Sequence, residues 1–164
     1  DSRPIIRCMP NTPALVGEGM TGLYSNSHAG AAEGKALAER VMSSVGQCVW
    51  VEEEPDLDVV TAISGSGPAY FFLFIESLTD AAIALGMDSE SARKLALQTA
   101  LGASRLASLS DEDAATLRKN VTSPGGTTEQ AIQSFETSDI RGIVARATQA
   151  AARRSVELSQ EFGV

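Results

Sequence analysis

The sequence predicts a short α/β segment followed by a longer segment that is helical throughout. Three observations support this division. The first fifty residues contain apolar runs of strand length that end at turn residues. The acidic run Glu52–Glu54 ahead of Pro55 is typical of a solvated connector. Apolar residues after Pro55 recur at helical spacing. We therefore expect a predominantly helical chain with two parts, residues 1–53 and residues 54–164.

The α/β part is expected to contain strands at residues 4–9, 20–25 and 48–51 and a helix over residues 29–45 that ends at Gly46. The glycines of the segment Gly17–Gly22 fit the spacing of dinucleotide-binding loops. Such a loop works by leading directly into a helix whose N-terminus faces a pyrophosphate. Here a strand-like run follows instead, so we interpret the match as coincidental.

The helical part is expected to contain six helices. Two cover residues 56–63 and 68–85, a third begins at Ser89 and a fourth at Ser110. The fifth follows the loop 120–127 and runs through Phe135, and the last covers residues 140–158. The break between the first two falls at Gly65–Gly67, and Pro68 suits the first turn of the second. Ser110 is expected to start a short helix, with Asp113 reaching back to it in a capping-box-like arrangement. The helix from Ser89 should bury one face, formed by Ala92, Leu95, Ala96, Thr99, Ala103 and Leu106.

The helix after Pro68 begins with the run Tyr70–Ile75, which is apolar on every side. A helix of this kind must be surrounded, and the few short helices of one chain can hardly do so. We therefore expect a second subunit to cover it, in a homodimer or a higher oligomer built from it. The uncharged run Val59–Ile75 is too short and too broken for a bilayer span, which favours a buried core element.

The charge balance also restricts the partners. Lys and Arg total 13 against 21 Asp and Glu, a net charge of −8. Such a surface repels phosphate backbones and anionic lipid, so neither nucleic acid nor a membrane is an expected partner. Cys8 and Cys48 are expected to be buried, reduced thiols, and with no secretory signal this favours the cytoplasm. His28 is the only histidine, which excludes a Ser-His-Asp triad within one chain, and no metal site is expected.

The segment best suited to a functional site is the polar loop 120–128, which leads directly into the start of a helix. Gly125 and Gly126 let bare backbone approach a ligand, and Thr127 is expected to form a capping box with Gln130. The first amides of a helix lack internal partners and lie at the positive end of its dipole. With nearby hydroxyls, they suit a carboxylate.

No His, Lys or carboxylate base lies within this loop. A pocket that orients an anion without a base suits chemistry carried by a cofactor, such as hydride transfer. An ordinary capped turn between helices explains the same residues equally well. The loop alone leaves both interpretations open.

Three segments together resemble the pyrroline-5-carboxylate reductases: Arg7–Pro13, Ser64–Tyr70 and Asn120–Thr128. The resemblance extends from about Arg3 to Glu161. It implies that residues 1–53 are the end of a Rossmann-type dinucleotide-binding domain and that residues 54–164 are a helical dimerisation and substrate-binding domain. It also implies an oxidoreductase of proline biosynthesis that reduces 1-pyrroline-5-carboxylate to L-proline with NADPH or NADH. The residues that select between the two cofactors belong to a region outside this chain.

The same resemblance assigns roles to particular residues. Thr128 would hydrogen-bond the ring nitrogen, and Asn120 would brace the loop. Thr128 and Ser123 are the catalytic candidates. The substrate carboxylate would rest on Ser123, Gly125, Gly126 and Thr127, and the nicotinamide would lie near Asn11, Thr12 and Pro13.

One departure from the family is large. The glycine fingerprint of its Rossmann domain lies upstream of the segment that this chain matches. We therefore expect a truncated chain that dimerises but is inactive alone. Two alternatives stay open: a related reductase of another cyclic imine or small carboxylate, and a non-catalytic helical oligomerisation module.

Overall fold

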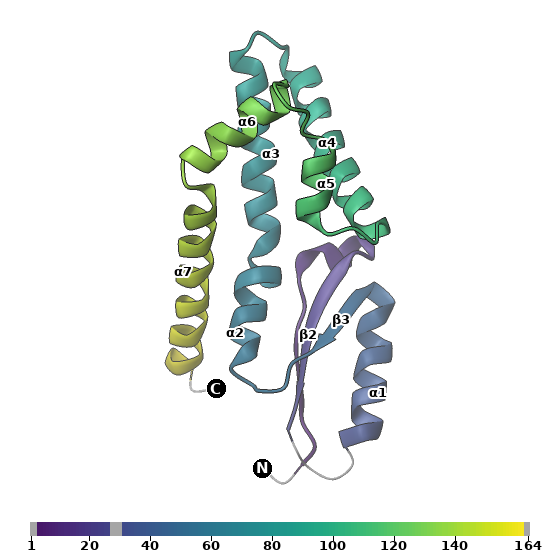
Figure 1. Cartoon of the computed structure of the whole chain (residues 1–164). Helices are drawn as coiled ribbons and strands as arrows, with labels where there is room; N and C mark the ends of the chain where they lie inside the picture. Colours follow the sequence, from purple (N-terminus) through teal and green to yellow (C-terminus); the bar gives the residue numbers. More distant parts are fainter. Residues whose placement is uncertain (1–2, 27–30, 163–164) are drawn as a thin grey trace. The chain divides into compact units, whose positions relative to one another are not determined.

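The structure is a computed structural model that describes residues 3–26 and 31–162. Figure 1 shows a small sheet with one flanking helix in the first part of the chain and helices in the rest. This confirms the predicted fold class. The chain divides into two compact units, which are described separately: Asp1–Tyr70 with Ala145–Val164, and Phe71–Val144.

The first unit holds the strands and the first helices. They are β1 (Ile6–Met9), a 3-10 turn (Thr12–Val16), β2 (Gly19–Ser25), α1 (Ala31–Met42), a second 3-10 turn (Ser43–Val45), β3 (Gly46–Trp50), α2 (Asp56–Val60) and a π-helical turn (Thr61–Gly65). The expected start of α1 at residues 29–30 lies outside the described residues.

The second unit is helical. It holds most of α3 (Gly67–Ala84), all of α4 (Ser89–Leu109), α5 (Ala114–Asn120) and α6 (Thr127–Thr137), and the start of α7 (Ile140–Glu161). The helix after Ser110 therefore begins later than expected. Asp113, as its N-cap, accepts a hydrogen bond from the Thr116 amide, and a helix begins directly after such a cap.

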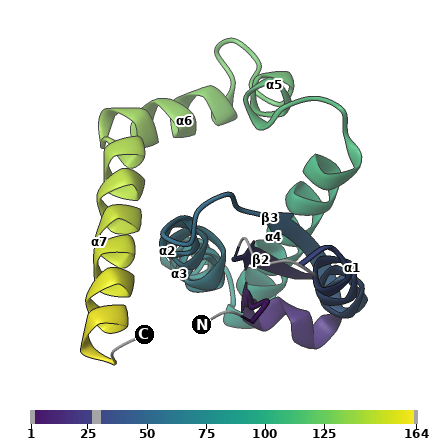
Figure 2. The ribbon, with the colours of Figure 1, turned by 90° about the horizontal axis from the view of Figure 1, so that it is seen from below.

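The sheet has the order β1-β2-β3, with β1 antiparallel and β3 parallel to β2. Leu23 of the central strand is fully buried. Its neighbour Gly22 faces α2, where an added Cβ would lie 2.6 Å from Val60 Cγ1. On the other face, a Cβ on Gly34 of α1 would lie 3.4 Å from Ile6 Cδ1. Helices α1 and α2 thus cover opposite faces of the sheet (Figure 2).

The glycine-rich segment before β2 does not lead into a helix. Gly17 ends the first 3-10 turn with φ 77°, a left-handed conformation that favours glycine, and Gly19 begins β2. The interpretation of this segment as a coincidental fingerprint match is confirmed.

The apolar start of α3 is not covered within the chain. Phe71, Phe72 and Leu73 are each about two thirds exposed, at 64, 65 and 63%. The helical stretch Asp56–Ala84 is long and apolar enough to cross a membrane, and 11% of its most apolar window is buried. The core helix of a soluble protein can be equally long and apolar. The expectation of a buried core element is therefore not met by one chain alone.

Helix α4 repeats this pattern. Of its expected inner face only Ala92 and Ala96 are buried, whereas Leu95 and Leu106 are more than half exposed. The expectation that the whole face is buried within the chain is wrong. Periodicity gives the apolar face of a helix but not the surface that covers it.

The expectation of two buried thiols is also wrong. Cys8 is exposed and Cys48 is half-buried, because they lie on the two outer strands of the sheet, and both are free. Partial desolvation and, to a smaller extent, the nearby Cys48 raise the pKa of Cys8 above its usual value.

Candidate functional site

The loop between α5 and α6 is shaped by its two glycines. Gly125 has φ 71°, which a residue with a side chain rarely adopts. The Gly126 amide donates to the Ser123 carbonyl over 3.0 Å and closes a tight turn. A Cβ on Gly126 would lie 3.0 Å from that same carbonyl oxygen. The glycine pair therefore allows the backbone to fold back just before α6.

The N-terminus of α6 leaves a row of donors without partners in the described part of the chain. Gly126 is the N-cap and has no side chain to offer. The helical pattern begins when the Gln130 amide donates to the Gly126 carbonyl over 3.3 Å. Within the described residues, no acceptor faces the amides of Thr127, Thr128 and Glu129, and no partner bonds the hydroxyls of Ser123, Thr127 and Thr128.

A carboxylate from just outside the loop, that of Glu129, bonds to its backbone. Glu129 Oε2 accepts a hydrogen bond from the Gly125 amide over 2.8 Å. The expected capping box of Thr127 with Gln130 is wrong, because α6 begins at Thr127 and its N-cap is Gly126. The third helical residue is then Glu129, which reaches back toward the cap. A glutamate at this position is a known sequence signal, and it could have identified Glu129.

Asn120 is the last residue of α5, just before the loop. Its side-chain amide donates to Glu112 Oε2 over 2.9 Å, which links the end of α5 to the segment just before the helix. At the start of the loop, the Thr122 hydroxyl donates to the Arg118 carbonyl over 2.6 Å. These bonds fix the point at which the loop leaves α5.

The candidates near the cofactor, Asn11, Thr12 and Pro13, lie in the first unit, directly after β1. Asn11 Oδ1 accepts from the Met20 amide over 2.8 Å, and Asn11 Nδ2 donates to the Ser64 carbonyl over 3.0 Å. Thr12 is exposed and Pro13 is half-buried within the 3-10 turn that follows Asn11. The substrate-side candidates belong to the second unit.

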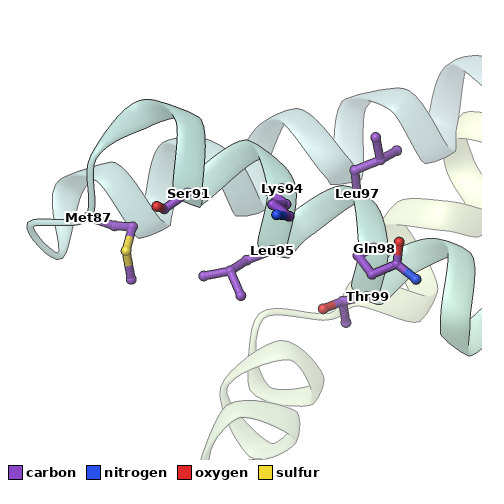
Figure 3. A pocket seen from close by; sticks show the side chains of 7 residues that line it. All are labelled: Met87, Ser91, Lys94, Leu95, Leu97, Gln98 and Thr99. Carbon is purple, nitrogen blue, oxygen red and sulfur yellow. The ribbon is translucent and has the colours of Figure 1, made fainter.

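The open hollow on α4 contains none of the candidate residues (Figure 3). Its side chains come from one helix and the turn before it, and no carboxylate or thiol is among them. Within residues 3–26 and 31–162, no three His, Cys, Asp or Glu side chains gather to hold a metal ion. The hollow is lined by Met87, Ser91, Lys94, Leu95, Leu97, Gln98 and Thr99.

Comparison with known proteins identifies the class of protein to which this chain is similar. A family profile described as pyrroline-5-carboxylate reductase dimerisation matches residues 54–158. A pyrroline-5-carboxylate reductase from Pseudomonas aeruginosa is 49% identical over 98% of this chain and 59% of its own length. One from Vibrio alginolyticus is 46% identical over 96% of this chain and 58% of its own.

Solved structures agree with the sequence matches. A pyrroline-5-carboxylate reductase from Coxiella burnetii has a TM-score of 0.92 and 45% identity, covering 96% of this chain and 58% of that one. The Plasmodium falciparum pyrroline carboxylate reductase with NADP bound has a TM-score of 0.83 and 39% identity, covering 92% of this chain and 61% of that one. The chain belongs to the pyrroline-5-carboxylate reductase family, and it spans about three fifths of the length of these relatives.

Proposed function

We propose that this chain is the substrate-binding and dimerising part of an enzyme that reduces the C=N bond of 1-pyrroline-5-carboxylate to L-proline. The row of unpartnered donors at the start of α6 carries this proposal. The names of the relatives support the reaction. In this division, residues 1–53 belong to the nucleotide-binding part and residues 54–164 to the helical part, and the reaction takes place in the cytoplasm.

The loop 120–128 binds the substrate carboxylate. The Thr127 and Thr128 amides and the Ser123 hydroxyl donate to its oxygens. Gly125 and Gly126 have no side chains, so the substrate can approach the backbone of the turn closely. Because the Glu129 carboxylate already accepts from the Gly125 amide, the ligand uses the donors that follow it. Asn120 fixes the loop at its α5 end.

Thr128 acts on the ring nitrogen. Reducing a C=N bond adds a hydride to the carbon and a proton to the nitrogen. A nicotinamide cofactor, NADPH or NADH, would supply the hydride when bound, and the proton comes from solvent. A hydroxyl that donates a hydrogen bond to the nitrogen orients the imine. It also stabilises the electron density that builds up on the nitrogen as the hydride reaches the carbon. The Thr128 hydroxyl has no partner within the described residues, so it is available for this bond.

The cofactor-side residues fit one end of a dinucleotide. Asn11, Thr12 and Pro13 directly follow β1, and the resemblance to the family supports a nicotinamide beside them. The turn after them presents exposed apolar side chains, Leu15 at 89% and Val16 at 77%, which suit an aromatic ring. A relative with NADP bound supports a pyridine nucleotide.

The assembly is a homodimer or a higher oligomer built from it. The exposed apolar start of α3 requires a covering surface, and the matching family profile is described as a dimerisation region. A second copy of the chain is the simplest partner that supplies such a surface.

The test is a reductase assay on the full-length protein, with 1-pyrroline-5-carboxylate and either cofactor. We expect L-proline as the product, and a fall in kcat/KM of roughly ten- to a hundredfold for Ser123→Ala and for Thr128→Ala, because each loses a hydrogen bond to a charged or reacting group. Ser134→Ala, on the same helix but outside the loop, is the matched control. Absence of turnover by the wild type would leave an oligomerisation module, and wild-type kinetics in both variants would overturn the site.

A further inference from the structure

We infer that Asn11 is a positioning residue whose side-chain amide fastens the loop after β1 to the π-helical turn at the start of the helical part. The inference rests on the proposed function, because that loop is the expected contact of the nicotinamide. It assigns Asn11 a role that acts through the loop rather than on a ligand.

The π-helical turn leaves a carbonyl that needs an outside donor. In an α-helix the Ser64 carbonyl would accept from the amide four residues later, but that residue is Pro68, which has no N–H. The next amide, that of Ala69, donates to the Ser66 carbonyl over 3.0 Å instead. Ser64 is half-buried, and an unpaired buried carbonyl is costly. Asn11 Nδ2, at 3.0 Å, supplies the missing donor.

The other end of the same amide fixes the loop to the sheet. Asn11 Oδ1 accepts from the Met20 amide over 2.8 Å, near the start of β2. One side chain thus joins three segments: the loop after β1, the start of β2 and the turn Thr61–Gly65. Its partner Ser64 is 53 residues away in sequence and lies beyond the proposed boundary at residue 54.

A second contact brings the same two segments together. Met9, the last residue of β1, lies against Gly65, where an added Cβ would be 2.8 Å from Met9 Cε. The turn is also held from its far side, since the Tyr70 hydroxyl donates to the Ala62 carbonyl over 3.0 Å. The turn is therefore a fixed support, and Asn11 is the polar link between it and the loop.

The experiment compares three variants of the full-length protein. Asn11→Ala removes both bonds. Asn11→Asp keeps the acceptor for the Met20 amide but replaces the donor to Ser64 with a second acceptor. The matched control is Asn26→Ala. Asn26 also bonds at both ends, accepting from the Ile5 amide over 3.0 Å and donating to the Arg3 carbonyl over 2.9 Å, but it holds only the strand ends.

The readout separates positioning from general stability. We expect Asn11→Ala to raise the KM for the nicotinamide cofactor about tenfold and to change the KM for the imine less than about twofold. Asn11→Asp should do the same while the Met20 amide stays protected from hydrogen exchange. Asn26→Ala should leave both KM values within about twofold of the wild type. Equal rises in both KM values, or an unchanged cofactor KM, would overturn the inference.

A double-mutant cycle tests the cause directly. Pro68→Ala returns an N–H four residues after Ser64, so the Ser64 carbonyl no longer depends on Asn11. The loss of thermal stability caused by Asn11→Ala should therefore be smaller in the Pro68→Ala background. Additive losses would contradict the role of Asn11. Because this cycle and the hydrogen exchange need no turnover, they decide the inference even if the proposed reaction fails.

Discussion

Glu129 places a negative charge beside the amides of Thr127 and Thr128, which in the proposed function bind the substrate carboxylate. The Glu129 carboxylate accepts from the Gly125 amide at 2.8 Å and so holds that glycine in its left-handed conformation. Among the residues that the structure describes, the amides of Thr127 and Thr128 donate to no protein acceptor. We infer that Glu129 sets the shape of the loop, and that the hydrogen bond matters more than the charge.

Substitutions at Glu129 distinguish these two contributions. Glu129→Ala should raise the KM for 1-pyrroline-5-carboxylate about fivefold, corresponding to roughly 1 kcal/mol, and should speed hydrogen exchange at the Gly125 amide. Glu129→Gln keeps an acceptor oxygen and should remain within about twofold of the wild type. Gln133→Ala, on the same helix, is the control. Equal effects from Glu129→Gln and Glu129→Ala would show that the charge dominates, because both variants remove it and only Gln keeps an acceptor.

At the residue scale, the sequence could predict the loop but not all of its contacts. Composition points to Gly125 and Ser123, because glycine and hydroxyl residues before a helix have recognisable uses. The sequence places the helix start one residue too late to identify Glu129 as the third helical residue. The bond from Asn11 to Ser64 joins positions 53 residues apart, and no local pattern reports such a pair.

At the scale of elements, the three strands and most helices could be predicted, because their apolar spacing and turn residues are local signals. The interruption before Pro68 was expected as a break, whereas the chain continues through the π-helical turn Thr61–Gly65. A single extra residue shifts the phase of the apolar face, but the five-residue α2 before the turn is too short for its sequence to reveal that shift. Its cause is visible only when the hydrogen bonds around Pro68 are followed.

Helix α5 leads into the candidate loop before α6, and its cap makes the helix sensitive to pH. Hydrogen bonds from the Thr116 amide and then the Thr116 hydroxyl hold the pKa of Asp113 below its usual range. With a lowered pKa in the folded state, the cap stabilises the helix fully above the usual carboxyl pKa. That contribution is lost as the pH falls through the lowered value.

An NMR titration of the Thr116 amide measures this dependence. We expect a midpoint below that of aspartate in an unfolded peptide of the same sequence. Asp113→Asn should keep the cap and abolish the titration, and Asp113→Ala should lose both. A midpoint at or above the peptide value would contradict the assigned cap.

At the scale of the whole molecule, the exposed apolar surface is the dominant feature. Phe71, Phe72 and Leu73 are each about two thirds exposed in one chain. Burying a large apolar side chain contributes about 1.5–3 kcal/mol, so covering several of them stabilises an assembly substantially. The sequence predicts that a cover is needed, but the identity of the covering surface is not encoded in the helix that needs it.

Sedimentation analysis tests the assembly. The full-length protein should sediment with at least twice the mass of one chain. Phe72→Glu should shift it toward the mass of one chain, because a charge at a buried apolar contact is costly. Leu15→Glu, at a position 89% exposed in the first unit, should leave the mass unchanged. A wild-type protein with the mass of one chain at micromolar concentration would contradict the dimer.

The central claim, that the start of α6 binds the carboxylate of a cyclic amino acid, is tested most directly by NMR titration of the full-length protein with L-proline. We expect the amide signals of Thr127 and Thr128 to shift with saturation. Pyrrolidine, which has the same ring without the carboxylate, should leave them unchanged. Unmoved signals with L-proline, or equal shifts with both ligands, would contradict the account.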